Sequence, residues 1–141
     1  MNNRTFAIIK PDAVSNGDTG KIFHKILQTG FNILGAKLIK LTQKQAEGFY
    51  EVHSKRPFFN DLVNFMSSGP CMVLALEKDQ AVNAWRETIG ATDPKEATEG
   101  TIRKEFASNI QNNAVHGSDS DENAQKEIAF FFAEGELIAN K

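Results

Sequence analysis

Three short runs of β-forming, apolar residues are separated along the chain by segments with helical periodicity. The runs are TFAII (5–9), the second half of FNILGAKLIKL (31–41) and CMVLAL (71–76). Pro11 ends the first run, and the pair Gly69-Pro70 provides a turn before the third. The third run shows no polar alternation, which is typical of a strand buried on both faces. Because such a strand needs helices on either side, the pattern predicts an α+β sandwich around a small sheet.

The helical segments are marked by apolar faces and by start and stop signals. One helix is expected from about Gly20 to Gly30, and a capping box of Thr42 and Gln45 opens a second. Asp79 is expected to cap a third. The inward-facing residues are Ile22, Phe23, Ile26 and Leu27 in the first helix, Ala46, Phe49, Tyr50 and His53 in the second, and Val82, Trp85 and Ile89 in the third.

The C-terminal third is expected to hold a long connection, a loop, a helix and a strand. A short helix is expected near Ile102 in the connection. After the loop, Ser118 or Ser120 would cap a helix that reaches Glu127, and IAFFF (128–132) is interpreted as the last strand. A split βαβ arrangement with antiparallel neighbours fits this order of elements best.

The composition is that of an ordinary globular protein, and the length fits one domain spanning residues 1–141. The net charge is −2, so no positive field draws the protein to nucleic acid or anionic lipid. The apolar runs are too short to span a bilayer, and the N-terminal sequence does not resemble a secretory signal. Cys71 is the only cysteine, which excludes an internal disulfide and favours a cytoplasmic location.

Two common ligand-binding patterns are not met by this sequence. GDTGK (17–21) looks like a phosphate loop, but its glycine spacing is wrong and Ile22 stands where a Walker A motif needs a hydroxyl. The three histidines lie far apart, and the chain has no cysteine pair and no HExxH motif, so no direct metal site is expected. His24 is expected to face solvent, and His53 to be a partly buried structural residue.

The stretch NNAVHGSDSDEN (112–123) allows two interpretations. It is either a loop that happens to contain His116, or a loop built around a nucleophilic histidine. Gly117 lacks a Cβ, so a bulky ligand could approach the backbone beside the imidazole. The serines and carboxylates that follow suit the first turn of a helix. Glu127, further along that helix, is within plausible reach of an imidazole nitrogen.

A site for a phosphoryl donor would need cations and a surface for the rest of the ligand. Lys10 ends a buried strand just before Pro-Asp, which indicates a positioned charge, whereas Arg86 and Arg103 could each be solvated surface charges. RPFF (56–59) places two phenylalanines side by side that cannot both point into one core. One of these rings is therefore expected to offer its face to a ligand.

Five motifs stand in a fixed order: IIKPDAV (8–14), RPFF (56–59), GATDP (90–94), GTIR (100–103) and NAVHGSDS (113–120). With them the sequence closely resembles the nucleoside diphosphate kinases over essentially its whole length. The resemblance implies a ferredoxin-like βαββαβ sandwich, in which helices cover a four-stranded antiparallel sheet. It also implies a phosphotransferase that passes the γ-phosphate of a nucleoside triphosphate, usually ATP, to a nucleoside diphosphate by a ping-pong mechanism. Such an activity maintains the pools of NTPs and dNTPs.

The resemblance implies a role for each matching position. His116 would carry the phosphate, and Ser118 and Glu127 would hold its ring. Lys10 would contact phosphate and ribose, and Tyr50 would lie near the transferred phosphate. The other nucleotide-binding positions are Phe58 as the ring on which the base stacks, Leu62 and Ile110 beside the base, Arg86, Thr92 and Arg103 at the β- and γ-phosphates, and Asn113 at the ribose hydroxyl.

The resemblance further implies Mg²⁺ carried on the nucleotide phosphates, with mostly water ligands and with Asp119 in contact through water. It implies a homo-oligomer, and the short C-terminal segment leaves tetramer and hexamer open. Asp93 replaces a frequent asparagine, and NGDTG (16–20) lacks an arginine that many relatives carry. Neither is a catalytic position, so these departures bear on subunit contacts.

Two other functions compete with this one. A non-catalytic member of the same fold would act as a binding or regulatory module, but its site would normally be damaged, and the motifs here are intact. A nucleic-acid binder could stack bases on exposed aromatic side chains of a small sheet. The acidic pI of about 5.9 and the missing basic stripe argue against that role.

Overall fold

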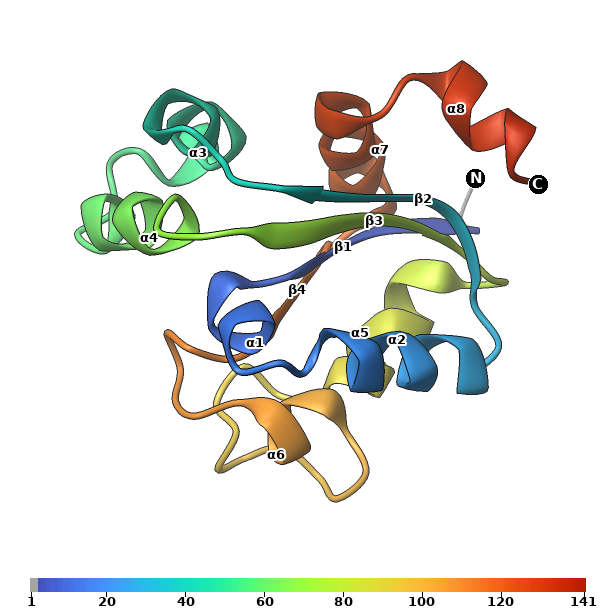
Figure 1. The fold of residues 1–141 in the computed structure, drawn as a ribbon, viewed down its shortest axis with the longest axis horizontal. Helices are drawn as coiled ribbons and strands as arrows, with labels where there is room; N and C mark the ends of the chain where they lie inside the picture. The colour runs from blue at the N-terminus through green and yellow to red at the C-terminus, as the bar shows by residue number, and fades with distance from the viewer. Residues whose placement is uncertain (1–2) are drawn as a thin grey trace.

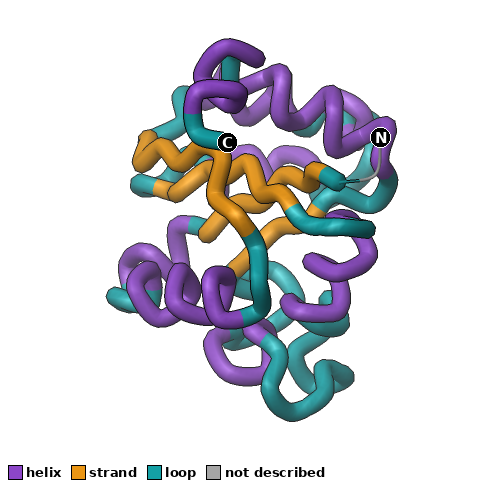
Figure 2. Tube along the Cα trace, turned by 90° about the vertical axis from the view of Figure 1, so that its right-hand side faces the viewer, coloured by secondary structure: helices purple, strands orange, loops and turns teal. Residues whose placement is uncertain are grey.

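A sheet runs through the middle of the molecule, with one layer of helices above it and one below (Figure 1; Figure 2). The computed structural model describes residues 3–141. The strands are β1 (Arg4–Ile9), β2 (Asn32–Ile39), β3 (Cys71–Glu77) and β4 (Val115–Gly117). The helices are α1 (Pro11–Ser15), α2 (Thr19–Gln28), α3 (Gln43–Phe49), α4 (Phe59–Met66), α5 (Ala81–Ile89), α6 (Ile102–Phe106), α7 (Asp121–Phe131) and α8 (Glu134–Ala139), with the short 3-10 helix η1 (Glu51–His53).

The strand order is β2-β3-β1-β4, and each neighbouring pair is antiparallel. In the central strand β1, Ile8 lies opposite Val73 of β3 on one side and opposite His116 of β4 on the other. Helices connect β1 to β2 and β3 to β4, which is the βαββαβ order of the ferredoxin-like fold. The expected four-stranded antiparallel sheet covered by helices is therefore confirmed.

The central strands are buried on both faces because each face has its own helical layer. Phe6, Ile8 and Val73 pack against buried residues of α3, α4, α7 and α8. Ala7 and Ile9 point the other way and pack against buried residues of α1, α2, α5 and α6. A strand between two apolar layers has no solvent-facing side, which explains why the apolar run in β3 lacks polar alternation.

Two helix starts follow the predicted chemistry. The capping box of α3 is present, with Thr42 Oγ1 accepting from the Gln45 amide at 3.1 Å and Gln45 Oε1 accepting from the Thr42 amide at 2.9 Å. At α7, Ser120 is the capping residue, because its Oγ accepts from the Asn123 amide at 3.1 Å. Ser118 lies outside this cap and makes a different contact.

The predicted C-terminal strand is wrong. IAFFF (128–132) completes α7 and its end, with Ile128 and Phe132 buried on one helical face. Phe130, midway between them, is 45% exposed, whereas in a strand positions 128, 130 and 132 would share one face. The fourth strand is β4, which takes His116 out of the predicted loop and pairs it with β1.

Other local expectations also fail. Asp79 does not cap α5, because Gln80 in a left-handed conformation (φ 53°) stands between it and the helix. Leu27 on α2 is not a core residue, because it is 57% exposed. Helix α4 was not predicted at all. His53 is partly buried as expected, but it belongs to η1 rather than to α3.

Candidate active site

His116 occupies the middle of the short edge strand β4. Its position opposite Ile8 directs the ring to the face of the sheet that α3 and α7 cover. There the rings of Phe6 and Phe49 stand edge-on to the imidazole, with centroid distances of 6.0 and 5.8 Å. The histidine ring is thus partly buried and held between aromatic neighbours.

One ring nitrogen of His116 has a fixed partner. Nε2 lies 2.9 Å from Glu127 Oε1, and Ser118 Oγ donates to the same oxygen at 2.7 Å. A carboxylate can only accept hydrogen bonds, so the hydrogen of this pair belongs to Nε2. In the neutral imidazole the lone pair is then on Nδ1, which is free for chemistry.

The backbone around His116 is anchored by α5. Trp85 Nε1 donates to the His116 carbonyl oxygen at 3.1 Å. A Cβ on Gly117 would come within 2.8 Å of Trp85 Cδ1 and within 3.0 Å of Ile89 Cδ1. The missing Cβ at Gly117 thus allows close packing against α5, while the expectation that a ligand approaches its backbone stays a prediction.

Lys10 and Asn113 form a buried polar pair. Lys10 Nζ donates to Asn113 Oδ1 at 2.8 Å, and Asn113 Nδ2 donates to the carbonyl oxygen of Thr92 at 3.2 Å. Burial and, to a smaller extent, the nearby charge of Arg103 lower the pKa of Lys10 to about 8, while the charge of Asp12 acts in the opposite direction. The predicted charge at the end of β1 is thus a lysine with a reduced proton affinity.

Arg103 is not a solvated surface charge. Its guanidinium donates to the carbonyl oxygens of Gly90 at 3.0 Å and Val115 at 2.9 Å, so it ties the long connection to β4. Burial lowers the pKa of Arg103 to about 10, and the charge of Arg86 acts in the same direction. Two arginines that line one cleft are suited to binding an anion.

A cleft of about 590 Å³ lies beside these groups, and Arg86, Thr92, Arg103 and Gly117 are among the residues that line it. Arg86 and Thr92 are exposed there. A hollow of about 630 Å³ lies elsewhere, between the start of β1 and helices α7 and α8. Because that second hollow contains no predicted site residue, the cleft with the two arginines is the better candidate for phosphate binding.

The remaining predicted residues lie around this centre. Tyr50 is buried, and its pKa is raised by burial and by the charge of Glu127. In RPFF, Phe58 is 48% exposed whereas Phe59 packs on the core, so one ring does face outward as expected. Leu62 is partly buried on α4 and Ile110 is 59% exposed.

The described part of the chain has no group of three histidine, cysteine or carboxylate side chains that could hold a metal ion. Asp119 is exposed, and its Oδ1 accepts from Asn123 Nδ2 at 2.6 Å.

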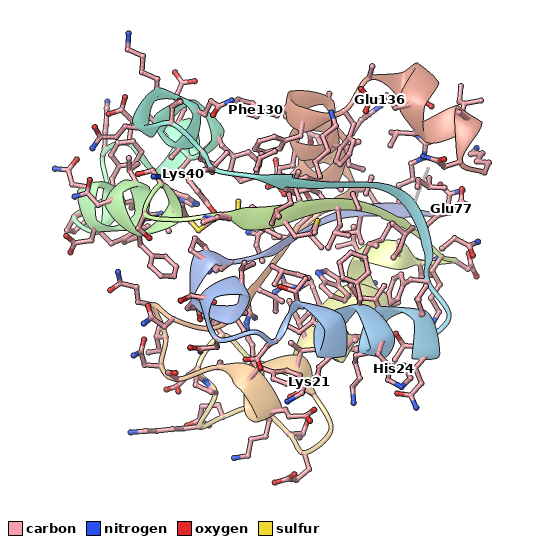
Figure 3. All side chains as sticks on the ribbon, in the orientation of Figure 1. Lys21, His24, Lys40, Glu77, Phe130 and Glu136 are labelled. Carbon is pink, nitrogen blue, oxygen red and sulfur yellow. The ribbon has the colours of Figure 1, made fainter. Side chains whose placement is uncertain are left out.

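Within residues 3–141, every helix is too short or too polar to cross a lipid bilayer. His24 projects outward from α2, as predicted (Figure 3).

Sequence reasoning missed two residues of the site. Trp85 was predicted only as a core residue, and its bond to the His116 carbonyl gave no sequence signal. Asp12 was noted only as part of the motif after Lys10, although its carboxylate accepts from the Ala114 amide at 3.1 Å. A buried lysine followed by a proline and an acid was the available signal for the second of these.

Comparisons with known proteins agree with this geometry. The family model described as nucleoside diphosphate kinase matches residues 3–137. The nucleoside diphosphate kinase of Geotalea uraniireducens is 59% identical over 135 residues, covering 96% of this chain and 98% of that protein. That of Salinibacter ruber is 53% identical over 137 residues, covering 97% of this chain and 96% of that protein.

Solved structures give the same result. The nucleoside diphosphate kinase of Aquifex aeolicus superposes with a TM-score of 0.94 at 45% identity, covering 96% of this chain and 98% of that one. That of Halobacterium salinarum, solved in complex with CDP, gives a TM-score of 0.91 at 35% identity, covering 97% and 91%. This chain belongs to the nucleoside diphosphate kinase family and is a phosphotransferase that acts on nucleotides.

Proposed function

We propose that His116 is the phosphate carrier of a two-step transfer from a nucleoside triphosphate to a nucleoside diphosphate. The hydrogen bond from His116 Nε2 to Glu127 supports this role, because it leaves the Nδ1 lone pair free to attack. In the first step a bond forms between Nδ1 and the γ-phosphorus. The bond between the γ-phosphorus and the oxygen that bridges it to the β-phosphate breaks, and the nucleoside diphosphate leaves with that electron pair. In the second step a nucleoside diphosphate takes the phosphoryl group back from Nδ1.

The other groups position the donor and neutralise its charge. Arg86, Arg103 and Thr92 would hold the β- and γ-phosphates in the cleft, and Lys10 with Asn113 would reach phosphate and ribose. The hydroxyl of Tyr50 is buried without a partner among residues 3–141, which supports its assignment close to the transferred group. Phosphoryl transfer relies mainly on such positioning and charge stabilisation.

The base would stack on Phe58, with Leu62 and Ile110 beside it, as the exposed ring suggests. The relative from Halobacterium salinarum was solved with CDP, which is a nucleotide of the class proposed here. Mg²⁺ would be carried by the nucleotide phosphates, since the described residues offer Asp119 but no cage of side-chain ligands. When bound, the ion would neutralise phosphate charge.

We further propose that residues 1–141 form one domain, that the protein is a homo-oligomer, tetramer or hexamer, and that it is cytoplasmic. The single sheet with two helical layers supports one domain. Leu38, exposed on the edge strand β2, supports contact with a second copy. The free, buried thiol of Cys71 fits a reducing compartment. Light scattering on the purified protein measures the oligomeric state.

Labelling with γ-phosphate-labelled ATP and Mg²⁺ tests the carrier. The protein should gain one phosphate that is labile in acid and stable in base, and a nucleoside diphosphate should discharge it. His116→Asn should abolish the label, whereas His24→Asn, which changes an exposed histidine on α2, should retain it (Figure 3). Glu127→Gln should slow labelling without abolishing it, because the ring loses its anchor but keeps its nucleophile. Label that survives in His116→Asn would overturn the assignment.

A further inference from the structure

Ala114 has a backbone conformation that is unusual for a residue with a side chain. Its φ is +73°, and the Val115 amide donates across it to the Asn113 carbonyl at 2.8 Å. A positive φ inside such a hydrogen bond is that of a γ-turn of the rare, strained kind. Ala114 is fully buried, so the strain must be balanced by contacts within the protein. The strained residue lies between Asn113 and His116, two residues of the proposed site.

Both peptide groups of Ala114 are held by one short segment at the end of β1. The Lys10 amide donates to the Ala114 carbonyl at 2.8 Å. The Ala114 amide donates to Asp12 Oδ2 at 3.1 Å. Because Lys10 Nζ also donates to Asn113, residues 10–12 fix the turn at three points. Among residues 10–12, Asp12 is the one whose side chain binds the backbone of the turn, while Arg103 binds the Val115 carbonyl from α6.

Asp12 makes this contact although it leaves one of its carboxylate oxygens buried without a hydrogen-bond partner among residues 3–141. It follows Pro11 in the first turn of α1, and that oxygen is Oδ1. Burial raises the pKa of Asp12, and the Ala114 amide and the charge of Lys10 oppose that rise. Asp12 as a residue is partly buried, and a carboxylate that served only to start a helix would be better placed in solvent, where it could cap the helix without desolvation.

We propose that Asp12 is a positioning residue for phosphoryl transfer, whose carboxylate holds Ala114 in its left-handed conformation and so sets the positions of Asn113 and His116. The inference rests on the proposed role of His116 as the phosphate carrier. Asp12 would touch neither nucleotide nor phosphorus, and it would act through the turn. The same carboxylate faces Lys10 from α1, while Arg103 faces that lysine from α6.

Glycine at position 114 provides the sharpest test, because glycine adopts positive φ without help. Asp12→Ala should slow single-turnover labelling of His116 by ATP by roughly 10- to 100-fold, since a small misplacement of reacting groups has effects of this size. When Ala114→Gly is already present, adding Asp12→Ala should slow labelling much less. On a logarithmic scale, this slowing should be at most about half of the slowing that Asp12→Ala causes in the unaltered chain. A residue that merely stabilised the fold would not be bypassed in this way.

Asp12→Asn separates the hydrogen bond from the charge. Asparagine can still accept from the Ala114 amide, so at pH 7 labelling should stay within about threefold of the unaltered protein. Without the carboxylate, Lys10 faces only the positive charge of Arg103, so the alkaline limb of kcat/KM should move to lower pH. Asp79→Ala, which removes an exposed acid before α5, is the control and should change neither quantity.

The outcomes separate the possibilities. Labelling of folded Asp12→Ala at the unaltered rate, or a double variant as slow as Asp12→Ala, would overturn the proposal. If Asp12→Ala does not fold, Asp12→Asn provides the test. A labelling rate more than about tenfold below that of the unaltered protein at pH 7 would then count against a role for the hydrogen bond to Ala114. If the unaltered chain forms no acid-labile phosphate, the carrier assignment fails instead. The effect of Asp12 on the conformation of Ala114 is then tested by thermal unfolding alone. Ala114→Gly should relieve the destabilisation caused by Asp12→Ala.

Discussion

Gly117 packs so closely against α5 that alanine in its place should lower both stability and transfer. The added Cβ would come within 2.8 Å of Trp85 Cδ1, 3.0 Å of Ile89 Cδ1 and 3.1 Å of Trp85 Nε1. The first of these distances is below any normal carbon–carbon contact, so something must move. Trp85 is fully buried and cannot rotate outward, which means that β4 and α5 must separate.

The expected loss follows from two effects. Inserting a methyl group into a packed core costs about 1–3 kcal/mol. The shift would also weaken the bond from Trp85 Nε1 to the His116 carbonyl, which is worth about 1 kcal/mol. Gly117→Ala should therefore lose about 2–4 kcal/mol, or roughly 6–14 °C in melting temperature for a domain of this size. Because His116 is the next residue, the transfer rate should fall as well.

Thermal unfolding followed by circular dichroism, with a coupled assay of phosphoryl transfer, measures both quantities. Gly20→Ala is the matched control, because a Cβ at that position of α2 meets no atom within 4 Å. It should leave activity unchanged and stability the same or slightly higher, as alanine favours a helix. If Gly117→Ala melts within about 1 °C of the unaltered protein, the packing estimate behind this prediction is wrong.

Three further predictions concern the proposed nucleotide contacts. Because the pKa of Lys10 is about 8 and lysine is charged only below its pKa, kcat/KM should fall as pH rises through about 8. Lys10→Arg should move that fall to higher pH, and a flat profile through pH 8 would contradict the role. Arg86→Ala removes an exposed cation from the cleft, so kcat should drop by roughly 100-fold with little change in melting temperature; an effect on KM alone would refute it. Phe58→Ala should raise KM for purine and pyrimidine nucleotides by similar factors, and strong rejection of pyrimidines by the unaltered protein would argue against stacking.

The sequence predicted the site better than it predicted the elements that carry it. The motif NAVHGSDS contains His116 and Ser118, and the family resemblance added Glu127; the structure brings these three side chains together. That success came from the resemblance to a family whose members share one fold. The periodicity of a single helix or strand does not show which distant residues meet. The functional roles of these residues stay predictions until they are tested.

The errors have physical causes. IAFFF is rich in residues that favour strands, and only its continuation of the apolar face of α7 shows that it is helical. β4 has only three residues, too few for any periodicity, and it exists because β1 offers a free edge. The strain at Ala114 was invisible for a different reason. Its conformation is imposed by Lys10 and Asp12, which lie about a hundred positions earlier in the chain.

The bond between Trp85 and the His116 carbonyl also makes the protein its own optical reporter. Trp85 is the only tryptophan in the sequence, so the whole indole emission comes from one ring. Its Nε1 is hydrogen-bonded to the backbone of the residue proposed to gain a doubly charged group during each catalytic cycle. Indole emission responds to nearby charge and to hydrogen bonding at Nε1. Both half-reactions can therefore be followed separately in stopped flow, on the unlabelled chain and with any nucleotide base.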